Sequence, residues 1–135
     1  MGGFESREHS IKADLACLKE ARDFAERAAE DHGFDSAGVY QLKLAMSEAV
    51  TNAIQHGSSS DEDPIYLRAV AEGEALAFYV KDTGRFAQLS KPGGDPAEEG
   101  GRGLEFMRRL MDEVELRPGD EGTLLRFAKR PEPGT

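Results

Sequence analysis

Residues 14–33, "DLACLKEARDFAERAAEDHG", repeat apolar residues every three or four positions, which predicts an amphipathic helix. Asp14 is a capping residue at its start, and Gly33 is a stop signal at its end. The same spacing places Cys17 on the apolar side, as a buried thiol. The apolar stripe consists of Leu15, Leu18, Ala21, Phe24 or Ala25, and Ala28.

Residues 35–57, "DSAGVYQLKLAMSEAVTNAIQHG", predict a second helix that stops at Gly57. Its apolar stripe consists of Val39, Leu42, Met46, Ala49 and Ala53. A short third helix is predicted over residues 104–113, "LEFMRRLMDE".

Alternating apolar and polar residues predict two hairpins. "IYLRAVA" and "ALAFYVKD" are joined by the turn "EGE", and "VELRP" and "TLLRFAKR" are joined by "GDEG". "EHSIK", residues 8–12, has the pattern of an edge strand. Between the hairpins, residues 83–103 hold six glycines and two prolines, which predicts a long loop or lid.

This order of elements predicts an α+β fold, a two-layer sandwich with helices on one face of a mixed, mostly antiparallel sheet. Residues 11–130 are expected to form one domain of ordinary size. Residues 1–10 and 131–135 are expected to be flexible tails.

The charge of −9 and the pI near 4.8 argue against direct nucleic-acid binding, which depends on Lys and Arg neutralising phosphates. No apolar run approaches the roughly 20 residues that cross a bilayer, and "MGGFESREHS" lacks a signal-peptide core. We therefore expect a cytoplasmic protein without a membrane anchor. The Gly2 to Ser6 spacing matches a myristoylation pattern, which we interpret as chance.

Three polar residues, Glu48, Asn52 and His56, follow one another at four-residue intervals beside the apolar stripe of the second helix. An Asn oxygen is a suitable ligand for Mg²⁺, and a carboxylate one turn earlier is placed to accept a proton. Ordinary boundary polarity explains Glu48 and Asn52 about equally well. His56 fits the preference of histidine for the last turn of a helix.

Two further segments suggest a nucleotide site. In "VKDTG", Asp82 ends a strand and Gly84 follows; a carboxylate selects the exocyclic amine of adenine, and a glycine lets the base pack on backbone. The same residues also suit a simple turn. In "EGGRGLEF", glycines precede a helix whose amides would bind phosphate, and Arg102 adds charge. Neither a P-loop nor a Rossmann motif is present.

Together these segments resemble the GHKL ATPases. "SEAVTNAIQHG" looks like the N box, "VKDTG" like the G1 box, "GGRGL" like the G2 box, and "GTLLRFAKR" is similar to the closing GT…K strand. "EAVTNAIQHG" and "GGRGLEFMRRLMDEVEL" resemble in particular the bacterial anti-sigma factor serine kinases. The similarity extends over roughly residues 10–130, and it implies a Bergerat fold that binds ATP between the long helix and a mobile lid.

Carried over to this chain, the resemblance implies that Glu48 is the general base and that Asn52 binds Mg²⁺. It implies that Asp82 binds the adenine amine with support from Thr123. The phosphates would be wrapped by Gly101, Arg102, Gly103 and Leu104. One departure is Phe86, which stands where the G1 box often has a second glycine.

The function that the resemblance implies is a serine kinase that uses ATP and Mg²⁺. It would bind a sigma factor, phosphorylate a serine of an anti-anti-sigma protein, and form a homodimer. One alternative is a binding module without catalysis. Another is the ATP-binding part of a histidine kinase, although only 47 residues precede Glu48, too few for a phosphoacceptor helical hairpin.

Overall fold

The computed structural model describes residues 5–57, 60–83, 96–119 and 122–131, and for residues 56–57 and 96–102 it describes the backbone. The strands are β1 (Ser6–Lys12), β2 (Pro64–Glu72), β3 (Ala75–Asp82), β4 (Glu113–Gly119) and β5 (Gly122–Lys129). The helices are η1 (Leu15–Cys17), α1 (Leu18–His32), α2 (Ser36–Asn52), its π-helical extension η2 (Ala53–Gly57) and α4 (Pro96–Leu110).

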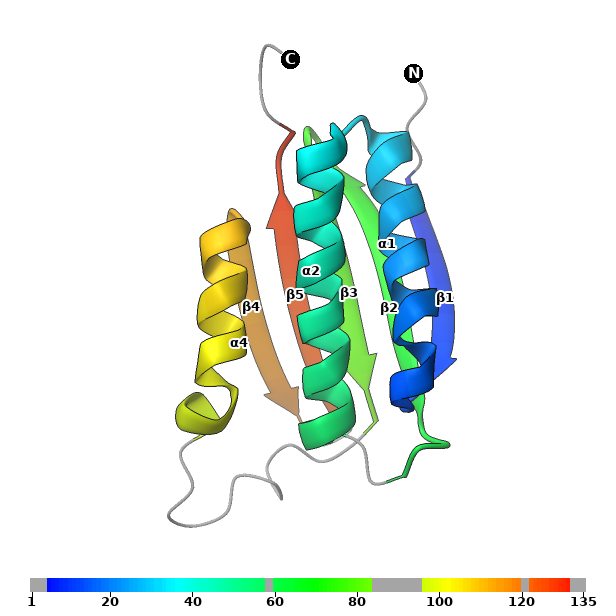
Figure 1. Ribbon diagram of the computed structural model, residues 1–135, viewed down its shortest axis with the longest axis vertical. Helices are drawn as coiled ribbons and strands as arrows, with labels where there is room; N and C mark the ends of the chain where they lie inside the picture. The colour runs from blue at the N-terminus through cyan, green and yellow to red at the C-terminus, as the bar shows by residue number, and fades with distance from the viewer. Residues whose placement is uncertain (1–4, 58–59, 84–95, 120–121, 132–135) are drawn as a thin grey trace.

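The sheet has the order β1-β2-β3-β5-β4, and each neighbouring pair of described strands is antiparallel. Helices α1, α2 and α4 lie on one face of it (Figure 1). The expected two-layer α+β sandwich and both hairpins are confirmed. Pairing of β3 with β5 joins the two hairpins into a single sheet.

The core fills the space between the helices and the sheet. Phe78 of β3 stacks on Phe127 of β5 with ring centroids 5.3 Å apart. Leu42 and Met46 of α2 and Met107 of α4 are fully buried against this layer. Because fully burying one such side chain contributes about 1.5–3 kcal/mol, the core holds α2 and α4 on the sheet.

The start of the first helix differs from the sequence prediction. Leu15 is 56% exposed, because residues 15–17 form a 3₁₀ turn whose threefold repeat shifts them out of line with the stripe of α1. Cys17, expected to be buried, is half-buried and packs against the core. Asp14 caps the turn through the amide of Ala16, and Gly33 ends α1 with φ 105°.

Two boundaries also differ. Strand β1 begins at Ser6, so residues 6–10 pair with β2 instead of forming a tail. Helix α4 begins at Pro96, inside the expected loop, because proline suits a first helical position and the following "AEE" favours helix. The long helix is α-helical to Asn52 and continues as the π-helical turn η2, which ends at the predicted residue Gly57.

The opposite face of the sheet is covered by none of the described helices, and it carries a charged network. Arg126 donates hydrogen bonds to Glu72 and Glu113, and Tyr79 donates one to Glu72. Burial raises the pKa of Glu72, but these hydrogen bonds outweigh it, so the pKa lies below its ordinary value. Tyr66 on the same face is 48% exposed.

None of the described helices is long and apolar enough to span a membrane.

Candidate functional site

Four segments that are distant in sequence meet at one end of the sandwich (Figure 1). They are the end of α2 with η2, the end of β3, the start of β5, and the first half of α4. Helix α4 contacts α2, and η2 contacts both β3 and β5. The segments with the predicted polar residues are therefore brought together by the fold.

Glu48 and Asn52 stand one turn apart near the C-terminal end of α2, and both are half-buried. The backbone of Gly103 in α4 lies directly against them. A β-carbon at Gly103 would lie 2.8 Å from Glu48 Oε2, 3.6 Å from Asn52 Nδ2 and 3.7 Å from Asn52 Oδ1. Any larger residue at this position would displace the Glu48 carboxylate, so the glycine permits the close approach of the two helices.

Asp82 and Thr123 form the second half of the site, where β3 ends and β5 begins. Both are almost completely buried, with 4% and 5% of their surface exposed. Asp82 Oδ1 accepts a hydrogen bond of 3.1 Å from the amide of Thr123. Thr123 Oγ1 has no hydrogen-bond partner among the described residues. Since buried polar atoms in native proteins are nearly always paired, this hydroxyl is available to a ligand or a water molecule.

Gly122 is a site residue that our sequence analysis missed. It adopts φ 132°, and a β-carbon there would lie 2.0 Å from the carbonyl oxygen of Asp82. Only glycine fits this backbone conformation and this close approach. The sequence signal for Gly122 was its place immediately before Thr123 in the closing "GT", where a glycine lets the chain bring Thr123 to Asp82.

The remaining predicted site residues lie in or before α4. Gly101 and Arg102 belong to the helix, but the side chain of Arg102 is outside the described part, as are Gly84 and Phe86. Leu104 is half-buried against the core. These residues were expected to start a helix, whereas α4 starts at Pro96. The amides of residues 101–104 are therefore directed to carbonyls one turn earlier and do not form an open helix end.

The donor set fits a nucleotide with a metal. A buried carboxylate beside an unpaired hydroxyl suits the amine edge of a purine. The amide oxygen of Asn52 suits Mg²⁺, which usually takes one or two protein oxygens and completes its shell with phosphate and water. Among the described residues, no group of three or more His, Cys, Asp or Glu side chains is placed to hold a metal ion.

Comparison with known proteins decides the family. Residues 11–129 match the family profile described as histidine kinase-like ATPase domain. The chain belongs to this family. The resemblance of its motifs to GHKL-type ATPases is thereby confirmed, and ATP is the nucleotide that the family implies.

Curated relatives specify the branch. The chain is 30% identical over 109 residues to the serine-protein kinase RsbW of Bacillus licheniformis, covering 72% of this chain and 68% of the relative. It is 33% identical over 100 residues to the anti-sigma F factor of Thermoanaerobacter sp. strain X514, covering 67% and 69%. The match to RsbW of Bacillus pumilus, at 35% identity, covers 62% of this chain and 60% of that protein. At the level of the family, the expected enzyme class of protein serine kinase is confirmed.

Two solved structures share the fold. The RsbU and RsbW domains of a Mycobacterium tuberculosis protein align with a TM-score of 0.72 at 21% identity, over 94% of this chain and 32% of that one. The histidine kinase domain of a blue-light activated kinase from Erythrobacter litoralis aligns with a TM-score of 0.56 at 21% identity, over 96% and 69%. Both show that the sandwich is the fold of this family.

The close approach at Gly122 gives a stability test. Gly122→Ala should lower the free energy of unfolding by more than about 3 kcal/mol, because it adds a backbone clash to an unfavourable φ. Gly33→Ala is the matched control: φ is 105° there, and a β-carbon would meet nothing within 4 Å. The control should lose only about 1–2 kcal/mol. Urea unfolding of both variants measures the difference, and equal losses would show that the contact with Asp82 is unimportant.

Proposed function

We propose that this protein is an anti-sigma factor serine kinase. It binds Mg-ATP, holds a sigma factor inactive, and phosphorylates a serine of a small anti-anti-sigma protein in the cytoplasm. The observation that carries the proposal is the contact of the Gly103 backbone with Glu48 and Asn52. It joins a candidate base and a candidate metal ligand to the glycine-rich segment expected to hold phosphates.

The adenine would bind at the buried end of β3. The Asp82 carboxylate accepts a hydrogen bond from the exocyclic amine, and the Thr123 hydroxyl completes the set directly or through water. Support comes from the burial of both residues and from the unpaired Thr123 Oγ1. The two groups would thereby select adenine and fix its orientation.

Transfer would take place at the end of α2. Asn52 would hold Mg²⁺, which when bound would neutralise charge on the phosphates. The serine oxygen of the partner forms a bond to the γ-phosphorus while the bond to the β–γ bridging oxygen breaks and ADP leaves. Glu48 accepts the serine proton. Phosphoryl transfer depends mainly on positioning and charge, so one base and one metal ligand are sufficient protein chemistry.

The phosphates would be held by residues 101–104, which in the described conformation are inside α4. Their amides can reach an anion only when the first turns of the helix open. We therefore propose that Mg-ATP remodels residues 96–104, while the part of α4 from Glu105 onward keeps its place on the core.

The names of the relatives support the partners. Relatives are named anti-sigma F factor and serine-protein kinase, which corresponds to a sigma factor as the bound protein and a protein serine as the acceptor. A homodimer is proposed as well, with the open face of the sheet around Tyr66 as an available surface. Incubation with labelled ATP and small partner proteins encoded nearby, followed by phosphoserine analysis, tests the kinase directly.

Adenine recognition by Asp82 is tested by calorimetry. Asp82→Asn should weaken Mg-ATP binding about 10- to 100-fold, since leaving a buried polar group unpaired costs about 1–3 kcal/mol. Asp23→Asn, an exposed acid on α1 that pairs with Lys19, is the control and should bind normally. A wild-type protein that takes up no nucleotide at millimolar ATP and Mg²⁺ would end the proposal.

Remodelling of α4 is tested by hydrogen exchange. Saturating Mg-ATP should change the exchange rates of the amides of residues 101–104, because their helical hydrogen bonds are replaced by bonds to phosphate. The amides of Arg109 and Leu110 should exchange as before, since the carbonyls that they bond, one turn earlier, lie in the part of α4 that keeps its place. Identical rates at residues 101–104 with and without nucleotide would contradict the proposed role of this segment.

The roles of Glu48 and Asn52 are separable. Glu48→Gln keeps the shape but cannot accept a proton, so ATP should still bind while transfer slows about 10²- to 10⁴-fold. Asn52→Ala removes the metal-binding oxygen and should weaken Mg-ATP binding itself. Calorimetry and phosphotransfer rates with the true partner distinguish the two. A Glu48→Gln protein as fast as wild type would favour a binding module without catalysis.

A further inference from the structure

The C-terminal end of α4 is fastened to the C-terminal end of β5. Lys129 Nζ donates a hydrogen bond of 2.9 Å to the carbonyl oxygen of Leu110, the last residue of the helix. Next to it, the amide of Asp112 donates to Ala128 O at 2.9 Å, and the amide of Arg130 donates to Asp112 Oδ2 at 2.8 Å. The first bond joins the helix itself to the sheet, and the other two join the connection that follows the helix to β5 and Arg130. All three lie at the end opposite the candidate site (Figure 1).

This helix ends differently from α1. The amide of Gly33, in a left-handed conformation, caps the carbonyls of Ala29 and Glu30, so α1 is capped by its own chain. Among the described residues only Gly33, Gly73 and Gly122 have a positive φ, so α4 has no such cap. Its terminal carbonyl is satisfied by Lys129 from another element. A cap of this kind fixes where the helix lies as well as where it ends.

The role of Lys129 is distinct from favourable charge at the end of the helix. Arg108 and Arg109 already place two cations in the last turn of α4, and both are exposed. Lys129 is half-buried and reaches the helix from the sheet. Its specific contribution is therefore the tie between α4 and β5.

The tie connects the two halves of the candidate site through β5. At one end of this strand the amide of Thr123 donates a hydrogen bond to Asp82. Lys129 follows six residues later, about 20 Å along the strand. From Leu110 the helix returns about 10 Å to Gly103, which lies against Glu48. The position of Gly103 thus depends on where β5 holds the far end of α4.

We propose that Lys129 is a positioning residue for phosphoryl transfer. By anchoring α4 at Leu110, it keeps residues 105–110 in place on the core, and so sets where Gly103 stands relative to Glu48 and Asn52 when the first turns of the helix rearrange around the phosphates. This inference rests on the proposed kinase function, since it assigns a role within that site. It predicts that loss of the tie affects the phosphate half of the site and leaves the adenine half intact.

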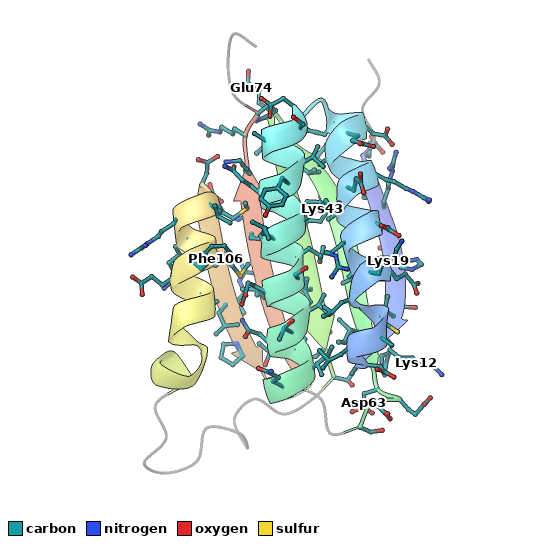
Figure 2. All side chains as sticks on the ribbon, in the orientation of Figure 1. Lys12, Lys19, Lys43, Asp63, Glu74 and Phe106 are labelled. Atoms are coloured by element: carbon teal, nitrogen blue, oxygen red, sulfur yellow. The ribbon has the colours of Figure 1, made fainter. Side chains whose placement is uncertain are left out.

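The test compares two ligands on three variants. Lys129→Met keeps most of the length of the side chain without the ammonium, Lys129→Arg restores a donor, and Lys19→Met removes an exposed cation on α1, away from α4 (Figure 2). In Lys129→Met, Mg-ATP affinity should fall about tenfold while adenosine affinity stays unchanged. Transfer at saturating ATP should slow about 10- to 100-fold, because small misplacements of catalytic groups are costly. Lys129→Arg should recover most of both, and Lys19→Met should match wild type.

A double-mutant cycle tests how Lys129 affects phosphoryl transfer. If Lys129 acts through the contact at Gly103, then Gly103→Ala combined with Lys129→Met should slow transfer by less than the product of the two single effects. If the double mutant instead slows transfer by the full product of the two single effects, Lys129 does not act through this contact and the proposal is overturned.

Other outcomes are also decisive. Equal losses of adenosine and ATP affinity in Lys129→Met would show a general structural role and overturn the proposal, as would unchanged ATP affinity and transfer. If Lys129→Met does not fold, Asp112→Ala serves instead, because it removes the neighbouring hydrogen bond to the amide of Arg130. It must show the same loss of Mg-ATP affinity with unchanged adenosine affinity. If the wild type binds adenosine and ATP, a failed prediction concerns Lys129 alone. If the wild type binds neither ligand, the kinase proposal itself fails.

Discussion

The antiparallel pairing of β3 with β5 is the interaction on which the rest of the structure depends. It joins two hairpins into one sheet, and it stacks Phe78 on Phe127 beneath α2. At one end of the pair, the absence of a side chain at Gly122 lets Thr123 approach Asp82. At the other end, Lys129 reaches the last carbonyl of α4. A single strand therefore places the proposed adenine half of the candidate site and anchors the helix that covers the proposed phosphate half.

The candidate site combines a rigid half and a half that must change in the proposed reaction. Asp82 and Thr123 are buried at strand ends, where the sheet fixes their positions. Glu48 and Asn52 are half-buried on α2 and are covered by the backbone of α4. The latter contact depends on packing between helices, which changes more easily than pairing within a sheet. A kinase needs this division, because the nucleotide must be oriented before the phosphates are enclosed.

Much of the site was readable in the sequence because each motif is local. The four-residue spacing of Glu48 and Asn52, the acid that ends "VKD" and the "GT" that starts the last strand are short-range patterns tied to one element each. Their order along the chain indicated the family, and the matching family profile over residues 11–129 bears this out. Gly122 was overlooked because its importance lies in its close approach to a carbonyl 40 residues away, where a β-carbon would lie 2.0 Å from the oxygen.

The sequence by itself determined the helical stripes, the two hairpins and the candidate polar groups, since periodicity and turn chemistry act over a few residues. It misplaced the start of α4, because six glycines and two prolines outweighed the helix-forming "AEE" in a local reading, whereas burial of Met107 and Met111 holds this helix on the core. Only the tertiary structure decided that Gly103 lies against Glu48 and that Lys129 caps α4. Both are contacts between elements, and the physical reason is that packing of the core sets distances that no local pattern encodes.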